Sequence, residues 1–227
     1  MKEHYQLTKK ESEHMSVFIC DGRDILNSIF NHLPEHIIRH SQRVAKMCGI
    51  ISGYVPEHRL PKGIDRATYR AALTKAGYYH EIGIYAARND VKSRSSAAEK
   101  MLTDYCCIDI MPEAHEIVFE AVRSHQERYY GGGYPRALAY EDIPLHANIC
   151  AIANTVDMLI CDGKFDNRVV RKAVNYISQN SGVLFHPDAV CYFEQACEEI
   201  FGLYLTPCRY AGGMMMKLLG RKLNKLL

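Results

Sequence analysis

The sequence HQERYYGGGYP, residues 125–135, places a histidine and a glutamate shortly before three consecutive glycines and a Tyr-Pro corner. Val118, Ala121, Val122 and His125 recur at the three- and four-residue spacing that puts side chains on one face of a helix. The glycines then end that helix, because glycine favours turns and positive φ. The stretch therefore predicts a helix whose last turn presents an imidazole on its buried side.

Two histidines further upstream have a similar setting. His40 follows Ile37 by three residues and precedes Val44 by four, so it shares the apolar stripe of an expected helix. His80 follows Ala76 by four residues at the end of another expected helix and should also point inward. A single histidine on such a face is more often a hydrogen-bonded core residue than a ligand. Three of them converging from different helices indicate a metal site.

Glu81 directly follows His80, so an imidazole and a carboxylate can reach one cation from consecutive positions. This mixed donor set suits divalent Fe, Mn, Zn or Ni, and such a metal can activate water for hydrolysis. The sequence contains no phosphate-binding loop of the Walker type. The three glycines after Tyr130 could permit a tight turn or cradle a phosphate, and the sequence leaves both readings open.

The rest of the chain also has a helical hydrophobic pattern. Apolar residues recur at helical spacing, no segment alternates with period two, and no internal repeat is found. Asp65 is expected to cap a helix and Pro112 to open one, while residues 86–96 have the composition of a loop. We therefore predict an all-α helical bundle in a single domain. The expected helices span residues 15–32, 35–54, 65–80, 97–107, 113–126, 144–159, 167–180 and 187–203.

The composition is that of a soluble globular protein, with 227 residues of which 48% are hydrophobic and 24% charged. No apolar run approaches the ~18–20 residues of a membrane helix, and the first residues contain no apolar signal core. A cytoplasmic protein without a transmembrane segment is therefore expected. The nine cysteines form no C-x-x-C pair and are expected to be reduced thiols, several of them in apolar surroundings: Cys48, Cys150, Cys191 and Cys197.

The C-terminal tail is basic. Five basic residues and no acidic residue follow Glu199; removing these five from 28 leaves 23 basic against 26 acidic residues, so no DNA-binding surface is expected on the body. Residues 1–14 are predicted to be a flexible lead-in, residues 15–205 the domain, and residues 206–227 a basic amphipathic C-terminal helix. That helix could pack on the body or on a second copy in a homodimer, or touch an anionic membrane or acidic partner.

Ordered matches to one known family run along residues 36–200. They are HSQRV at 40–44, HEIG at 80–83, HQER at 125–128 with GYP at 133–135, IP at 143–144, AIANTVD at 151–157 and SGVLFHP at 181–187. On these motifs the chain resembles the HD-GYP branch of the HD phosphohydrolase superfamily. The resemblance implies an HD-type helical bundle that binds two or three metals and, in typical members, hydrolyses cyclic di-GMP.

The departures from the family pattern fall at its ligand positions. Glu81 stands for the bridging Asp, Ile84 for a phosphate-contacting Lys, Gln126 for a second His, Tyr130 for an Asp and Asn154 for the last Asp ligand. Only Glu81 then remains as a carboxylate in this set, and neutral imidazoles and amides donate electrons without adding negative charge. A divergent site is therefore expected, with one divalent transition metal (Fe, Mn, Zn or Ni) rather than two, or with none.

The resemblance also implies roles for individual residues. The activity it implies is that of a metal-dependent phosphodiesterase on cyclic di-GMP or another phosphate ester, weakened or lost through these departures. The alternative is a non-catalytic nucleotide- or protein-binding signalling module that retains the fold, with the loop from Gly131 to Pro135 contacting a partner. The expected metal ligands are His40, His80, Glu81, His125 and Asn154; the expected catalytic residues are Glu81, His125 and Glu127; and the expected substrate-binding residues are Arg128, Tyr134 and Lys164.

Overall fold

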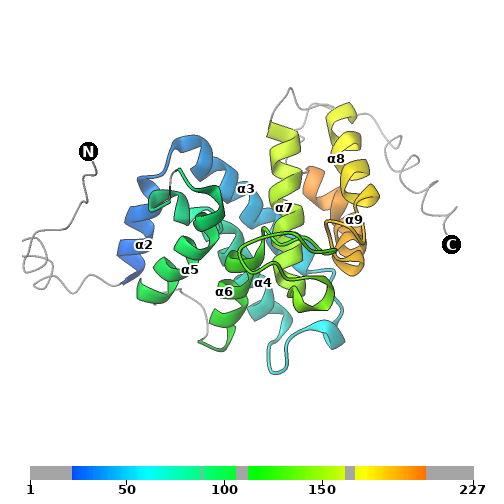
Figure 1. Ribbon diagram of the computed structural model, residues 1–227. Coiled ribbons are helices and arrows are strands. Elements are labelled where there is room, and N and C mark those ends of the chain that lie inside the picture. The colour runs from blue at the N-terminus through cyan, green and yellow to red at the C-terminus, as the bar shows by residue number, and fades with distance from the viewer. Residues whose placement is uncertain (1–21, 88, 106–111, 162–166, 203–227) are drawn as a thin grey trace, which may run out of the picture.

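The computed structural model describes residues 22–87, 89–105, 112–161 and 167–202, and these residues form helices with no strand among them beyond an isolated bridge between Ser181 and Phe185 (Figure 1). The all-α prediction is confirmed. The α-helices are α2 (Gly22–Asn31), α3 (Glu35–Ser52), α4 (Arg66–Tyr79), α5 (Arg94–Tyr105), α6 (His115–Ser124), α7 (Leu145–Cys161), α8 (Asn167–Gln179) and α9 (Pro187–Gly202), and the short 3₁₀ turns are η1 (Glu57–Arg59), η2 (Ile82–Tyr85), η3 (Val91–Ser93), η4 (Pro112–Ala114) and η5 (Tyr140–Asp142).

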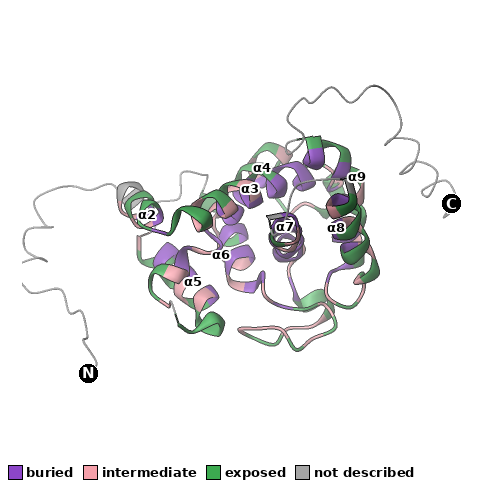
Figure 2. Ribbon diagram, turned by 90° about the horizontal axis from the view of Figure 1, so that it is seen from above, coloured by how far each residue is buried: buried purple, intermediate pink, exposed green. Residues whose placement is uncertain are grey.

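Helix α7 lies at the centre of the bundle. It packs against α3, α4 and α6 on one side and against α8 and α9 on the other. Figure 2 views α7 nearly end-on, with α2 and α5 on the far side of α6 from it. The sequence of α7 is apolar nearly all round, which predicted this central position. Its buried apolar residues include Ala147, Ile149, Cys150, Ile152, Ala153 and Val156.

The packing of α3 on α4 brings two of the expected ligand segments together. These two helices share the most extensive contact of the bundle. Gly77 allows this close approach, since a Cβ there would lie 2.7 Å from the Cα of Ala45. Asp65 caps α4 as predicted, because its side chain accepts a hydrogen bond of 2.7 Å from the backbone N–H of Thr68. The last turn of α4, which contains Gly77, therefore lies directly against α3.

Two predicted boundaries were wrong. Residues 86–96 were expected to be a loop, but they contain η3, and α5 begins at Arg94. The reason is tertiary: a Cβ on Gly83 would lie 2.0 Å from the carbonyl oxygen of Arg94, so η2 packs directly on the first turn of α5. Pro112 begins the 3₁₀ turn η4, and the α-helix that it was expected to open starts at His115.

The core confirms most of the predicted burial. Cys48, Cys150 and Cys197 are buried free thiols, whereas Cys191, expected in apolar surroundings, is exposed. In the part of the chain that the structure describes, no helix combines the length and the hydropathy that a membrane crossing requires. The predicted lead-in of residues 1–14, the tail of residues 206–227 with its basic helix, and Lys164 lie outside the described residues.

Candidate metal centre

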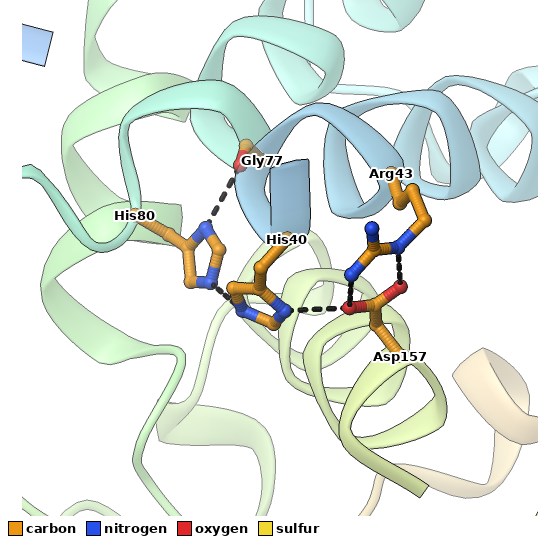
Figure 3. A network of polar contacts seen from close by, with 5 residues as sticks. All are labelled: His40, Arg43, Gly77, His80 and Asp157. Atoms are coloured by element: carbon orange, nitrogen blue, oxygen red, sulfur yellow. Dashed lines mark hydrogen bonds and ion pairs between the residues drawn. The ribbon is translucent and has the colours of Figure 1, made fainter. Parts of the chain in front are cut away.

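The ends of two packed helices bring an imidazole pair and a carboxylate to one point. His40 lies on α3, His80 follows the last turn of α4, and Glu81 comes directly after it. One ligand atom from each of these residues lies within 4.8 Å of the other two. The Nε2 atoms of His40 and His80 are 3.1 Å apart and face each other (Figure 3). The convergence expected from the helical pattern therefore occurs for these residues.

The hydrogen bonds of the imidazoles fix which ring nitrogen carries the proton. The Nδ1 of His80 is 2.8 Å from the carbonyl oxygen of Gly77, and the Nδ1 of His125 is 2.8 Å from that of Val122. A carbonyl oxygen only accepts hydrogen bonds, so in both rings Nδ1–H donates and Nε2 keeps its lone pair. Both rings are thereby held in the tautomer that a metal ligand needs at Nε2.

Asp157 fixes His40 in the same tautomer. The side chain of Asp157 is fully buried and its Oδ2 accepts a hydrogen bond of 2.7 Å from the Nδ1 of His40. Arg43 donates to both oxygens of the same carboxylate, at 2.6 and 2.9 Å (Figure 3). Burial opposes the charge of Asp157, but the hydrogen bonds from His40 and Arg43 outweigh it and lower its pKa to about 2. A charged carboxylate behind an imidazole orients the ring and raises its basicity as a ligand.

When both rings are neutral, the facing Nε2 atoms have no hydrogen between them. Two lone pairs 3.1 Å apart repel each other unless a cation or an extra proton lies between them. Two imidazole nitrogens at about 2.0–2.1 Å from a single ion are about 3–3.4 Å apart for right-angle to tetrahedral geometry. The observed separation of His40 and His80 falls in that interval, so the pair fits a divalent metal.

Burial also keeps the rings in the form that binds metal. Burial, and then the neighbouring His40, lower the pKa of His80 to about 3. Burial, and then His80, lower the pKa of His125 to about 4. Both imidazoles are therefore neutral near pH 7, and protons do not compete strongly with a cation there.

Asn154 supplies a further sign of a missing partner. This α7 side chain is 5% exposed, and its Oδ1 has no hydrogen-bond partner among the described residues. It interacts with the imidazole of His80, where it favours the protonated ring. A buried carbonyl oxygen left unpaired costs about 1–3 kcal/mol, so such an atom usually has a ligand or water. An oxygen donor at this position fits the cation that the imidazole pair suits.

Comparison with known proteins identifies the family of this chain. A family model described as the HD domain matches residues 24–189. The chain belongs to the HD domain family. Its relatives identify the HD-GYP branch. A protein of Thermotoga maritima named "Cyclic di-GMP phosphodiesterase" is 33% identical over 203 residues, which cover 82% of this chain and 52% of the relative.

Two further relatives match shorter segments. The "Cyclic di-GMP phosphodiesterase response regulator RpfG" of Xanthomonas campestris pv. campestris is 36% identical over 86 residues, covering 36% of this chain and 23% of that protein. A "Probable cyclic di-GMP phosphodiesterase" of Vibrio cholerae is 34% identical over 80 residues, covering 33% and 17%. The chain spans about half the length of the Thermotoga relative and less of the other two.

The third histidine of this HD domain lies beside the ligand group without joining it. The ring centroids of His125 and His80 are 5.2 Å apart, with the ring planes nearly perpendicular. Among the residues that the structure describes, the group of atoms within 4.8 Å of one another nevertheless contains only His40, His80 and Glu81. The Nε2 of His125 accepts a hydrogen bond of 3.2 Å from the side-chain amide of Gln126. The predicted role of His125 as a ligand stays a prediction, and in this structure its lone pair is occupied.

Glu127 is directed to the glycine-containing loop. It is buried, its Oε1 accepts a hydrogen bond of 2.7 Å from the backbone N–H of Arg136, and its Oε2 accepts one of 3.1 Å from that of Leu138. Both carboxylate oxygens thus hold the far side of the loop. This geometry is that of a residue that positions the loop, and the catalytic role predicted for Glu127 has no support from it.

The glycines are explained by the backbone of a tight corner. Gly131 and Gly132 have φ values of 99° and 77°, in the left-handed region that favours glycine. Gly133 has no room for a side chain, because a Cβ there would lie 2.4 Å from the backbone nitrogen of Arg128 and from the Cα of Glu127. Of the two readings open at the level of sequence, the structure supplies direct evidence for the turn.

The two described residues predicted to bind substrate flank this corner. Arg128 is exposed, whereas Tyr134 is only partly exposed. Burial raises the pKa of Tyr134, the carboxylate of Glu81 raises it further, and the positive charges of Arg94 and Arg128 oppose that rise. Tyr134 therefore lies in the field of both the ligand group and the two arginines.

The polar network around Asp157 was missed at the level of sequence as a site feature. In the sequence, Asp157 was identified only as the last residue of the AIANTVD motif. The available signal was its spacing: it follows Asn154 by three residues and therefore shares a helix face with it. Arg43 follows His40 by three residues and therefore shares a face of its helix with His40. The pairing across α3 and α7 depends on how these helices pack.

Proposed function

We propose that this HD domain is a metal-dependent phosphohydrolase of the phosphodiesterase type. Its proposed substrate is cyclic di-GMP or another phosphate ester, with an activity weakened by the altered ligand positions. The observation that carries the proposal is the pair of facing Nε2 lone pairs of His40 and His80, 3.1 Å apart and within reach of Glu81. Two facing acceptors are unfavourable in a packed core, whereas a cation site needs such lone pairs as ligands.

The residues that would hold the metal are His40, His80 and Glu81, with Asn154 as a neutral oxygen donor. A divalent ion bound there would supply Lewis-acid stabilisation of a phosphoryl group and would lower the pKa of water. One ion is proposed, of Fe, Mn, Zn or Ni, because Glu81 is the single carboxylate of the group. Asp157 does not add to that charge at the metal, since Arg43 neutralises it.

The chain's own groups would orient both metal and substrate. Asp157 and the carbonyl of Gly77 hold the two imidazoles in the ligand tautomer. Arg128, at the exposed edge of the loop, offers a guanidinium that suits a phosphate group. Tyr134 offers a hydroxyl whose pKa is influenced by the charges of both Glu81 and Arg128. Lys164, also proposed to contact substrate, lies outside the described residues.

Ile84 stands where the family has a lysine. An isoleucine cannot neutralise a phosphate, so affinity for a doubly charged cyclic dinucleotide is expected to be lower than with a lysine there. This substitution supports the proposal of weakened activity. Ile84 also lines a cavity of about 290 Å³ together with His32, Leu33, Pro34 and Tyr85, none of which is a proposed ligand.

The second candidate function is a binding module for a nucleotide or a signalling protein. The occupied lone pair of His125 favours it, because a third imidazole that is hydrogen-bonded to Gln126 is satisfied without metal. The loop from Gly131 to Pro135 would be the contact surface for a protein partner. Tyr134 at its end is only partly exposed, whereas Tyr130 before it is 68% exposed. This function predicts binding that persists in EDTA.

Metal content and hydrolysis together test the proposal. Protein purified without chelators should contain close to an equivalent of a divalent transition metal and hydrolyse bis(p-nitrophenyl) phosphate, with cyclic di-GMP as the second substrate. His80→Ala should lose both properties. His58→Ala is the matched control, since His58 is exposed in η1 and does not belong to the ligand group. Metal content below about a tenth of an equivalent in wild type, with no hydrolysis on addition of metal, would contradict the proposal.

A further inference from the structure

Gln126 makes an unusual contact with the third histidine. The Nδ1–H of His125 donates to the carbonyl oxygen of Val122, so the Nε2 of that ring is an acceptor. The Nε2 of Gln126 lies 3.2 Å from that acceptor, and the amide N–H of Gln126 therefore donates to it. The orientation of the glutamine amide follows from the tautomer, since its carbonyl oxygen could not approach a lone pair favourably.

The backbone holds Gln126 in place for this contact. The backbone carbonyl oxygen of Gln126 accepts a hydrogen bond of 3.3 Å from the backbone N–H of Tyr134, and this bond ties Gln126 to the loop. The next residue, Glu127, is anchored on both sides of its carboxylate by the same loop. His125 itself is buried, so its Nε2 has little access to water as an alternative donor. The contact is thus a built feature of the corner between α6 and the glycines.

The three histidines consequently divide into two kinds. With both rings neutral, the facing Nε2 atoms of His40 and His80 share no hydrogen, whereas the Nε2 of His125 accepts one from Gln126. His125 nevertheless lies beside His80, with ring centroids 5.2 Å apart, and within the field of Glu81. The ring is close enough to take part in the site, but the hydrogen bond from Gln126 occupies the lone pair that would bind a metal.

We infer that Gln126 is an internal competitor of the metal: its amide occupies the Nε2 of His125 and keeps this third imidazole out of the ligand group of His40, His80 and Glu81. The inference rests on the proposed metal-dependent function and names a residue that lowers the metal affinity of the site. Metal recruitment of His125 must break this hydrogen bond, so the affinity is lower than the same ligands would give without the glutamine amide.

Gln126→Leu tests the inference, because leucine keeps most of the side-chain volume and has no donor. Titration with Co²⁺, whose visible spectrum responds to the number of ligands, should show binding about threefold to tenfold tighter than in wild type, together with a spectral change. Gln195→Leu is the control: Gln195 is exposed on α9 and bonds the Sγ of Cys191, and its loss should leave Co²⁺ binding unchanged.

A second measurement examines the hydrogen bond without metal. In EDTA, the ¹⁵N resonance of the His125 Nε2 should move in Gln126→Leu, while those of His40 and His80 stay in place, and the thermal midpoint verifies that the variant is folded. An unmoved His125 resonance, or equal Co²⁺ affinity in wild type and Gln126→Leu, would overturn the inference and leave the proposed function standing. Absence of Co²⁺ binding by both proteins would overturn the proposed function and the inference together.

Discussion

Replacement of Asp157 by asparagine should weaken the protein in two separate ways. The side chain of Asp157 is fully buried and accepts hydrogen bonds from Arg43 and His40. Asparagine has nearly the same shape but no charge, and its amide group turns one acceptor into a donor. The substitution therefore removes the negative charge of Asp157 that the partly buried guanidinium of Arg43 binds, and it removes the support behind His40.

The size of the loss of stability follows from the pKa of Asp157. Its pKa of about 2 lies below the ordinary value of 3.8, and at about 1.36 kcal/mol per pKa unit this difference is about 2.4 kcal/mol of stability. Deletion of one partner of a buried ion pair costs about 3–5 kcal/mol, and asparagine still accepts a hydrogen bond. We therefore expect Asp157→Asn to lower the free energy of unfolding by about 2–4 kcal/mol.

The sign of the pH dependence is fixed by the direction of the pKa change. A folded-state pKa below the unfolded value stabilises the protein above about pH 4, and this stabilisation disappears as the pH falls from about 4 to about 2. The difference between wild type and Asp157→Asn should shrink over the same range. At neutral pH the variant should also bind metal about 10- to 100-fold more weakly, because the carboxylate no longer orients His40.

Urea unfolding in EDTA, followed by circular dichroism, separates the stability effect from metal binding. Asp104→Asn is the matched control, because its carboxylate forms an exposed pair with Lys100 on α5 and its loss should change the free energy of unfolding by less than about 0.5 kcal/mol. A loss at Asp157 as small as that at Asp104, or an unchanged metal affinity, would show that Asp157 does not support His40.

Three further substitutions address the loop and the surface of the bundle. Glu127→Gln should cost about 1–3 kcal/mol and speed hydrogen exchange of the two loop amides that Glu127 binds; unchanged exchange would contradict its anchoring role. Gly133→Ala should destabilise by about 1–3 kcal/mol or more through the clash of its Cβ, whereas Gly202→Ala, with open space around it, should have little effect on the thermal midpoint. The pKa of Glu120 is lowered chiefly by its hydrogen bond with His146, so wild type should be more stable than Glu120→Gln above the unfolded pKa of the carboxyl and lose that advantage in acid; a pH-independent difference in urea unfolding would exclude this linkage.

The sequence predicted those features that a helix determines by itself. Helical spacing fixed the direction of His80 and His125 toward the core, and both are buried. The sequence of α7 is apolar nearly all round, and this predicted that the helix would be buried at the centre of the bundle. The start of α5 at Arg94 was missed because it depends on the contact with Gly83, which lies in another part of the chain.

The fine structure of the site depends on relations that spacing does not encode. Asp157 meets His40 across 117 positions, and only the packing of α7 on α3 brings them together. The donation from Gln126 to His125 is between neighbours, but it requires a particular tautomer and side-chain rotamer. Glu127 was expected to be catalytic, yet both of its carboxylate oxygens accept hydrogen bonds from backbone N–H groups, those of Arg136 and Leu138.

Diffraction from crystals soaked in Mn²⁺, measured at the manganese absorption edge, would locate a bound metal ion. We expect a single anomalous peak between the Nε2 atoms of His40 and His80, with an oxygen of Glu81 about 2.0–2.2 Å from it. The same crystals should show His125 still accepting its hydrogen bond from Gln126. Absence of a peak at this point, or side chains of His40 and His80 turned away from each other around apolar contacts, would contradict the proposed metal site.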